Sequence, residues 1–108
     1  MNNKTLGKIV YAEFGRYPER PFLFGLQLGF EFKGSGIFDG GRYTVNISDA
    51  CRWERSEKLD ALEEMINHTN KILADAKVDC VSQLIGKPVE VILENHTFKD
   101  FRILTEVL

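Results

Sequence analysis

FLFGLQLGFEF, residues Phe22–Phe32, is the stretch that decides the fold class of this chain. Along it, six apolar residues occupy every second position: Phe22, Phe24, Leu26, Leu28, Phe30 and Phe32. This alternation places all six on one face of a β-strand. The other face includes Gly25 and Gly29, where another backbone should approach closely or a bulge should form. The segment therefore predicts a strand that builds one wall of the hydrophobic core.

Further strands are expected on both sides of this segment. Period-two alternation predicts them at Gly7–Phe14, Arg42–Ile47, Pro88–Glu94 and Thr97–Leu108, the last being one strand or a strand pair. Asp39–Gly40 is a strong hairpin-turn signal, because both central positions of a type I′ turn need a positive φ. Asn95–His96 predicts a second tight turn.

One long helix is predicted between the two groups of strands. It begins near Trp53 or Ser56 and ends at Ala76, after turn and cap residues at Ser48 and Asp49. Its apolar face is spaced by three and four residues and consists of Leu59, Leu62, Ile66, Thr69, Leu73 and Ala76, widened by Met65 and Ile72. Acidic residues in its first turns and lysines near its end stabilise the helix by interacting favourably with its dipole.

Asp79–Ile85 predicts a short second helix, with Asp79 as the N-cap and Gly86 as the stop signal. The element order is then β-β-β-α-α-β-β. This order indicates a single α+β domain over residues 1–108, with an antiparallel sheet of about five strands and the long helix across one face. A single helix can bury only part of one face of such a sheet. The aromatic Phe22–Phe32 strand is therefore also a candidate dimer interface.

Composition bounds the possible functions. The chain has 108 residues, 44% of them hydrophobic and 28% charged, which is typical of a globular domain. No apolar run approaches the roughly 20 residues needed to span a bilayer, and the N-terminus lacks the apolar core of a signal peptide. We therefore expect a cytoplasmic protein that does not interact with membranes. Cys51 and Cys80 are then expected to be free thiols.

The net charge of −2 is unevenly distributed along the chain. Residues 1–53 carry seven Lys/Arg and five Asp/Glu, whereas residues 54–108 carry seven and eleven. A duplex nucleic-acid binder usually has a basic patch or a high isoelectric point, and the value here is near 5.7. The mild positive bias of the first half suits a small anionic ligand better than duplex nucleic acid.

Catalysis has little support in the sequence. The two histidines, His68 and His96, are expected to be solvent-exposed and to play no catalytic part. Neither histidine has a cysteine at a spacing that suggests a nucleophilic pair. The clustered four-ligand pattern of a zinc site is missing as well. We therefore expect a protein that is not an enzyme and needs no cofactor or metal.

The segment Gly34–Arg55, GSGIFDGGRYTVNISDACRWER, is the candidate binding region. It contains four of the nine glycines, three arginines and the single tryptophan. Glycine backbone and a helix N-terminus can hold an anion. Arginine binds phosphate through two parallel hydrogen bonds, and aromatic rings stack on bases. The candidate ligand-binding residues are Arg16, Tyr17, Gly40, Gly41, Arg42, Tyr43, Arg52, Trp53 and Arg55.

Two other interpretations of this segment remain open. The glycines can serve only to form a hairpin, with Arg52 and Trp53 as ordinary surface residues. The segment can also be a protein interface. Neither Walker nor Rossmann glycine spacing is present.

Several segments resemble a family of small bacteriophage and prophage accessory proteins. They are DAK at 75–77, GKPVEV at 86–91 and the closing RILTEVL at 102–108, together with the KIVYAEFG start at 8–15 and the aromatic second strand. The resemblance implies a phage protein that acts in the host cytoplasm. It carries no catalytic motif and assigns no role to any residue.

Small phage proteins of this kind commonly counter host defence. The resemblance therefore implies an anti-defence protein, for which two classes are considered. The first is a sponge that binds a cyclic oligonucleotide or a cyclic ADP-ribose-type signal without cleaving it, often as a homo-oligomer. The second is an anti-CRISPR-like inhibitor that binds a host defence protein directly. A phage assembly or scaffold protein is a third possibility.

We favour the sponge, because sequestration needs arginine and aromatic groups but no catalytic residue. In that hypothesis Arg42, Arg52 and Arg55 contact phosphate, and Trp53 or Tyr43 stacks on a base or ribose.

Overall fold

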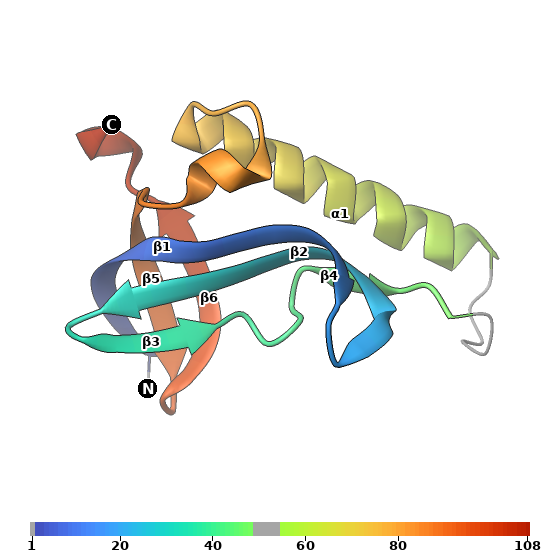
Figure 1. Ribbon diagram of the computed structural model, residues 1–108, viewed down its shortest axis with the longest axis horizontal. Helices are drawn as coiled ribbons and strands as arrows, with labels where there is room; N and C mark the ends of the chain where they lie inside the picture. Colours follow the sequence, from blue (N-terminus) through green and yellow to red (C-terminus); the bar gives the residue numbers. More distant parts are fainter. Residues whose placement is uncertain (1, 49–54) are drawn as a thin grey trace.

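The computed structural model describes residues 2–48 and 55–108. Two long strands dominate it, β1 (Asn2–Tyr17) and β2 (Arg20–Phe32), which pair as an antiparallel hairpin. The remaining strands are β3 (Ser35–Phe38), β4 (Thr44–Asn46), β5 (Pro88–Glu94) and β6 (Thr97–Ile103). The helix α1 (Arg55–Ala76) lies above the sheet in Figure 1. Two 3₁₀ turns, η1 (Val81–Leu84) and η2 (Thr105–Val107), complete the described elements.

All strand pairs are antiparallel, and the sheet order is β3-β2-β1-β5-β6. β4 continues the edge that β3 begins, because both pair with β2 at different points along its length. The predicted α+β class, with one long helix and a largely antiparallel sheet, is confirmed. Two details differ: the short second helix is the 3₁₀ turn η1, and a further strand, β3, is present.

β1 has two partners along its length, and this division bends the sheet. Its first half pairs with β5, from Asn2 opposite Glu94 to Lys8 opposite Pro88, and its second half pairs with β2. The change of partner coincides with a register shift between Ile9 and Tyr11. A bulge of this kind bends a strand and increases its twist. As a result β5 and β6 run across the β1–β2 hairpin in Figure 1.

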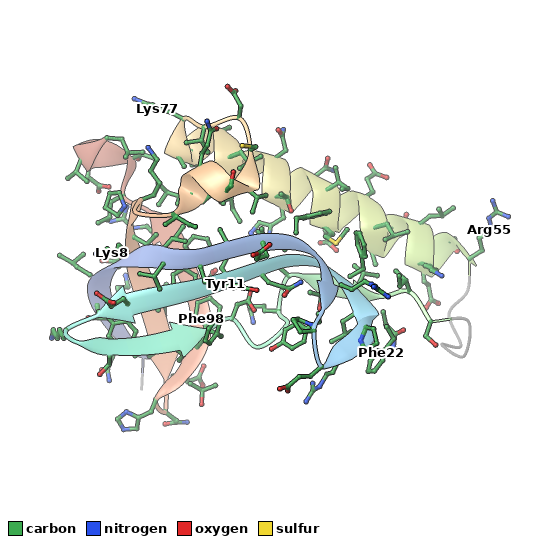
Figure 2. All side chains as sticks on the ribbon, viewed as in Figure 1. Lys8, Tyr11, Phe22, Arg55, Lys77 and Phe98 are labelled. Atoms are coloured by element: carbon green, nitrogen blue, oxygen red, sulfur yellow. The ribbon has the colours of Figure 1, made fainter. Side chains whose placement is uncertain are left out.

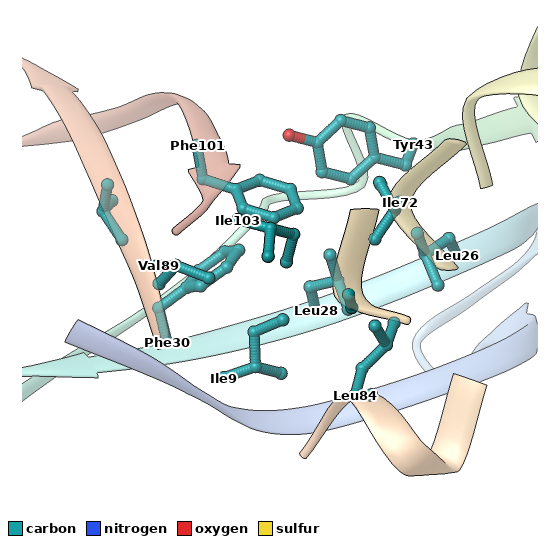
Figure 3. Close-up of a cluster of buried hydrophobic side chains, with 13 residues drawn as sticks. Ile9, Leu26, Leu28, Phe30, Tyr43, Ile72, Leu84, Val89, Phe101 and Ile103 are labelled. Carbon is teal, nitrogen blue, oxygen red and sulfur yellow. The ribbon is translucent and has the colours of Figure 1, made fainter. Parts of the chain in front are cut away.

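The bend brings β6 over the inner face of β2, although two strands separate them in the sheet order. Phe30 of β2 stacks on Phe98 of β6, with ring centroids 5.3 Å apart and an interplanar angle of 9°. The Phe30 and Phe101 rings are 4.9 Å apart. The core therefore forms between two parts of one sheet, and α1 does not have to cover a flat sheet alone. Figure 3 shows the buried residues of this core, with Phe30 and Phe101 side by side.

The Phe22–Phe32 prediction is confirmed at the centre of the strand. Leu26, Leu28 and Phe30 are at most 1% exposed. Burial decreases toward the hairpin end, where Phe22 is 44% exposed. Phe24 and Phe32 are partly buried.

The hairpin turn that follows β2 lies at a different position from the one that the sequence predicted. The two-residue turn lies at Lys33–Gly34, with φ of 49° and 77°, and it joins β2 to β3. These positive φ values are those of a type I′ turn, which needs them at both positions. Asp39–Gly40 instead begins the turn between β3 and β4. The predicted Asn95–His96 turn is confirmed, with φ of 52° and 64°.

The predicted strand Thr97–Leu108 is shorter in the structure, because the chain leaves the sheet after Ile103 and forms η2. Phe101 and Ile103 are buried, whereas Val107 is 65% exposed. The bounds of two other predicted strands, Gly7–Phe14 and Arg42–Ile47, also differ from those in the structure. β1 extends to Asn2–Tyr17, and β4 covers only Thr44–Asn46.

The helix bounds are confirmed, but its buried face is rotated from the predicted one. The residues that α1 buries are Met65, Thr69, Ile72 and Ala76. Leu59 and Ile66, which the sequence placed on the buried face, are 53% and 54% exposed. The helix is anchored mainly by its C-terminal half. There, Ile72 and Ala76 join the core with Leu84 of η1.

Candidate functional site

An open cleft of about 610 Å³ lies between β4 and the middle of α1. We call it the β4–α1 cleft. Its lining residues are Arg42, Tyr43, Thr44, Val45, Asn46, Ala61, Glu64, Met65 and His68. One wall comes from β4 and the two residues before it, and the other wall comes from α1.

The turn before β4 fixes one wall of the cleft. Asp39 Oδ1 accepts a hydrogen bond from the Gly41 N–H at 3.0 Å, and its Oδ2 accepts one from the Leu28 N–H at 3.0 Å. Gly40 and Gly41 have φ of 70° and 83°, a region that favours glycine. The Thr44 hydroxyl then donates to the Gly41 carbonyl at 2.6 Å. These contacts place Arg42 and the β4 side chains at the cleft.

The glycines of the Gly34–Arg55 segment do not form one anion cradle. Gly34 belongs to the β2–β3 turn, whereas Gly40 and Gly41 lie beyond the other end of β3. Each of these three glycines has a positive φ that its turn requires. The interpretation that the glycines serve turn formation therefore accounts for their conformation.

Tyr43 lies in the floor of the cleft and is only 8% exposed. Its ring contacts Phe98 and Phe101, with centroid distances of 6.2 and 5.9 Å, and the His68 imidazole at 4.8 Å. A ring with so many neighbours has little free face for stacking on a base.

The Tyr43 hydroxyl is buried and has no hydrogen-bond partner within hydrogen-bonding distance among the described residues. Burial is the main cause that raises the pKa of Tyr43 far above its ordinary value, and the charge of Asp100 raises it further. The tyrosine is therefore neutral at physiological pH.

His68 is a cleft residue that the sequence assigned to solvent, and the structure corrects this. It is partly buried, lines the cleft and packs against Tyr43. His68 lies one helical turn after Met65, which is buried, and four residues after Glu64. That spacing could have indicated a shared face. However, nothing in the sequence shows which strand lies under that face.

The charges in the cleft are mixed. Arg42 is the one basic side chain among the lining residues, apart from the imidazole of His68, and Glu64 is the one carboxylate. Arg42 forms no ion pair within the described residues. An exposed guanidinium without a partner is available for an anionic group.

The other predicted site residues are dispersed. Arg55 is the first residue of α1 and is exposed. Tyr17 lines a separate pocket with Tyr11, and the exposed Arg16 lines neither hollow. Arg52 and Trp53 lie outside the described residues, as does Cys51. Among the predicted residues, the structure thus brings Arg42 and Tyr43 together, next to Gly40 and Gly41.

The described residues contain no group of three or more histidine, cysteine, aspartate or glutamate side chains arranged to hold a metal ion. Within the same ranges, no helix is both long enough and apolar enough to cross a bilayer. Cys80 is exposed and is not part of a disulfide.

The fold and the cleft define an α+β protein with a strongly bent antiparallel sheet and an open hollow at the sheet-to-helix junction. No protein-family profile matches the chain, and neither a curated protein nor a solved structure shows significant similarity to it.

Proposed function

We propose that this protein binds a nucleotide-derived signal in the β4–α1 cleft and sequesters it without cleaving it. In this proposal it is a phage anti-defence protein that acts in the host cytoplasm, and the ligand is a cyclic oligonucleotide or a cyclic ADP-ribose-type molecule. The supporting observation is that Arg42, Glu64 and His68 lie in one open cleft whose volume of about 610 Å³ is within the usual range for small-molecule sites.

Each of these groups suits a different part of a nucleotide. The Arg42 guanidinium can hold a phosphate through two parallel hydrogen bonds. The Glu64 carboxylate accepts hydrogen bonds, as a ribose diol or an exocyclic amino group would require. The His68 imidazole packs against Tyr43 at an interplanar angle of 51°, and its other face can stack on a base. In this arrangement Tyr43 supports the stacking group rather than contacting the base itself.

The charge in the cleft limits the ligand. With one arginine and one glutamate among the lining residues, a single phosphate is matched better than a polyphosphate. Arg55 at the start of α1, and Arg52 in the sequence just before it, are the candidates for additional phosphate contacts. A cyclic dinucleotide or a larger cyclic ligand then requires those two arginines or a second copy of the chain.

Isothermal titration calorimetry with cyclic dinucleotides, cyclic trinucleotides and cyclic ADP-ribose isomers tests this function. We expect at least one ligand with a dissociation constant of about 1 μM or lower, equivalent to about −8 kcal/mol. Arg42→Ala should weaken its binding about 10- to 100-fold, because a hydrogen bond to a charged group contributes about 1.5–3 kcal/mol. Lys4→Ala is the charge-matched control, since Lys4 lies in the half of β1 that pairs with β5 and does not line the cleft.

Two results would contradict the proposal. One is that no ligand in the panel reaches micromolar affinity. The other is that Arg42→Ala and Lys4→Ala bind a ligand equally well. Mass spectrometry of the ligand released after binding tests sequestration separately, because a sponge returns the nucleotide intact.

A direct protein inhibitor is the second candidate, and one surface favours it. The exposed surface of α1 carries two apolar residues, Leu59 and Ile66, and three acidic residues, Glu57, Asp60 and Glu63, while a fourth acidic residue, Glu64, lines the cleft. An apolar patch with an acidic rim is suited to a basic protein surface. Charge reversal at Glu57 and Asp60 should then abolish capture of a purified defence effector, while leaving nucleotide binding in the cleft unchanged.

A further inference from the structure

A second hollow lies on the other face of the β1–β2 hairpin and has a different character from the β4–α1 cleft. Its volume is about 300 Å³, and we call it the aromatic pocket. Its lining residues are Tyr11, Tyr17, Pro18, Glu19, Gln27, Phe38 and Asp39. Gln27 alternates along β2 with the core residues Leu26 and Leu28, which places the pocket on the face opposite the core. Tyr11 is labelled over this hairpin in Figure 2.

Two of the aromatic side chains that line the pocket, Tyr11 and Phe38, lie very close to the backbone of β2. Phe38 and Tyr11 meet edge to face, with ring centroids 5.6 Å apart. Both lie directly over Gly29, where an added Cβ would be 2.9 Å from Phe38 Cε1 and 3.0 Å from Tyr11 Cβ. Phe38 is nevertheless 61% exposed, which is high for a phenylalanine. The glycine therefore allows the two rings to stand side by side with free surface toward the pocket.

Two buried polar side chains complete the pocket. Gln27 is 5% exposed and Asp39 is 6% exposed. The Gln27 amide donates from Nε2 to the Gly15 carbonyl at 3.2 Å. Its Oε1 has no hydrogen-bond partner among the described residues. This oxygen is not among the buried unpaired atoms of the described residues and is therefore open to solvent, so it can accept a hydrogen bond from a ligand.

Asp39 adds a carboxylate that pairs with no cation in the part of the chain that the structure describes. Both carboxylate oxygens accept backbone N–H groups, and no described lysine, arginine or histidine is paired with them. Burial raises the pKa of Asp39, and the two backbone donors offset part of that rise. A cation that entered the pocket would favour the ionised carboxylate.

The pocket thus combines three aromatic rings, two carboxylates and an unpaired amide oxygen, and none of its lining residues is basic. Aromatic faces attract cations through the ring quadrupole, and nearby carboxylates add to that attraction. The neighbours in the sheet are mixed: Glu13 lies opposite Gln27, and Arg20 lies opposite Tyr17 at the hairpin end. We propose that the aromatic pocket binds an organic cation, the ammonium or guanidinium head of a small molecule or of a basic side chain.

This site is independent of the nucleotide proposal, because the aromatic pocket and the β4–α1 cleft share no lining residue. Its volume suits one head group rather than a whole nucleotide. The failure of either proposal therefore leaves the other intact.

Choline and its neutral analogue 3,3-dimethyl-1-butanol, which have the same shape, provide the decisive comparison. Titration of each into the full chain, followed by NMR chemical shifts, should show choline binding about tenfold more tightly, since a desolvated cation–π contact is worth this much. N-acetyl-arginine amide is tested in parallel. Preference for choline would indicate a small-molecule ammonium, and preference for the arginine amide would indicate a basic side chain of a protein partner.

Phe38→Leu and Tyr17→Leu should each weaken binding of the preferred cation about 3- to 10-fold. Phe22→Leu is the matched control, because Phe22 is also an exposed aromatic of the hairpin but does not line the pocket. Glu19→Gln gives a second test on a surface residue, with a smaller loss expected.

Each of three outcomes would overturn the proposal. The first is that neither cation shifts the resonances of the pocket at about 10 mM, well above the millimolar range of weak fragment binding. The second is that the neutral alcohol binds as tightly as choline. The third is that Phe38→Leu and Phe22→Leu have equal effects on binding while both variants are folded, as verified by circular dichroism.

Discussion

Replacing Asp39 by alanine tests the most specific tertiary contact in the chain. The Asp39 carboxylate joins β2 to the turn before β4, because one oxygen accepts the Leu28 N–H and the other accepts the Gly41 N–H, both at 3.0 Å. The Asp39→Ala variant leaves both donors without this acceptor. The Leu28 N–H is buried, whereas the bond to Gly41 is only partly buried, so water can replace the second partner more easily than the first.

The expected change in the free energy of unfolding follows from the different burial of these two hydrogen bonds. Hydrogen bonds to charged groups contribute about 1.5–3 kcal/mol each, and an unsatisfied buried donor costs about 1–3 kcal/mol. Removing a buried charge also recovers part of its desolvation cost. We therefore expect Asp39→Ala to lower the free energy of unfolding by about 2–3 kcal/mol, less than the sum of two charged hydrogen bonds.

Urea denaturation of the wild type and the variant measures this difference, provided that the m-value is unchanged. Asp79→Ala is the matched control, since Asp79 is exposed and its carboxylate makes no described interaction. Its effect should remain within about 0.5 kcal/mol. If Asp39→Ala is as stable as Asp79→Ala, the carboxylate does not hold the turn, and our account of how Arg42 is positioned is wrong.

The pH dependence of the same site gives a further result. Burial raises the pKa of Asp39 above its ordinary 3.8, so the native state holds this proton more tightly than the unfolded chain does. The corresponding stability is complete below the unfolded pKa and is lost as pH rises through the native pKa. Asparagine does not titrate. The stability advantage of the wild type over Asp39→Asn should therefore be larger in acid than at neutral pH, and an advantage that grows with pH would contradict the assigned direction.

Two further predictions concern the core and the close approach of the sheet to α1. Phe30→Ala should cost about 3–5 kcal/mol in urea denaturation, because it empties the centre of the aromatic cluster, whereas Phe22→Ala at the exposed hairpin end should cost less than about 1 kcal/mol. Equal losses would mean that β6 does not pack on β2. Gly25→Ala should lower the melting temperature and cost about 2 kcal/mol or more, since its Cβ would lie 2.5 Å from the Tyr43 carbonyl oxygen and 2.6 Å from Met65 Sδ. Gly36→Ala, whose nearest contact would be 3.4 Å away, should be nearly neutral, and a similar loss for both variants would contradict this packing.

Much of the candidate site was outside the reach of sequence reasoning. Arg42 and Tyr43 were predicted as ligand-binding residues because they are a basic and an aromatic residue in the segment between the predicted strands and the predicted helix. His68 was missed because it lies more than twenty positions away along the chain, and only the docking of α1 over β4 brings it to Tyr43. Tyr17 was grouped with the same site, yet the structure places it in the aromatic pocket with Phe38.

The sequence by itself determined the properties that depend on neighbouring residues. Period-two alternation located β2 and β5, period 3.6 located α1, and residue chemistry located the Asn95–His96 turn, because strands, helices and tight turns impose local spacings. The tertiary structure decided the rest. The sequence predicted a hairpin turn at Asp39–Gly40, whereas the pairing of Ser35–Phe38 with β2 places the two-residue turn at Lys33–Gly34. The bulge in β1 bends the sheet until β6 packs on Phe30, and the packing of α1 beside β4 forms the β4–α1 cleft. Such contacts join distant parts of the chain, so no local pattern can specify them.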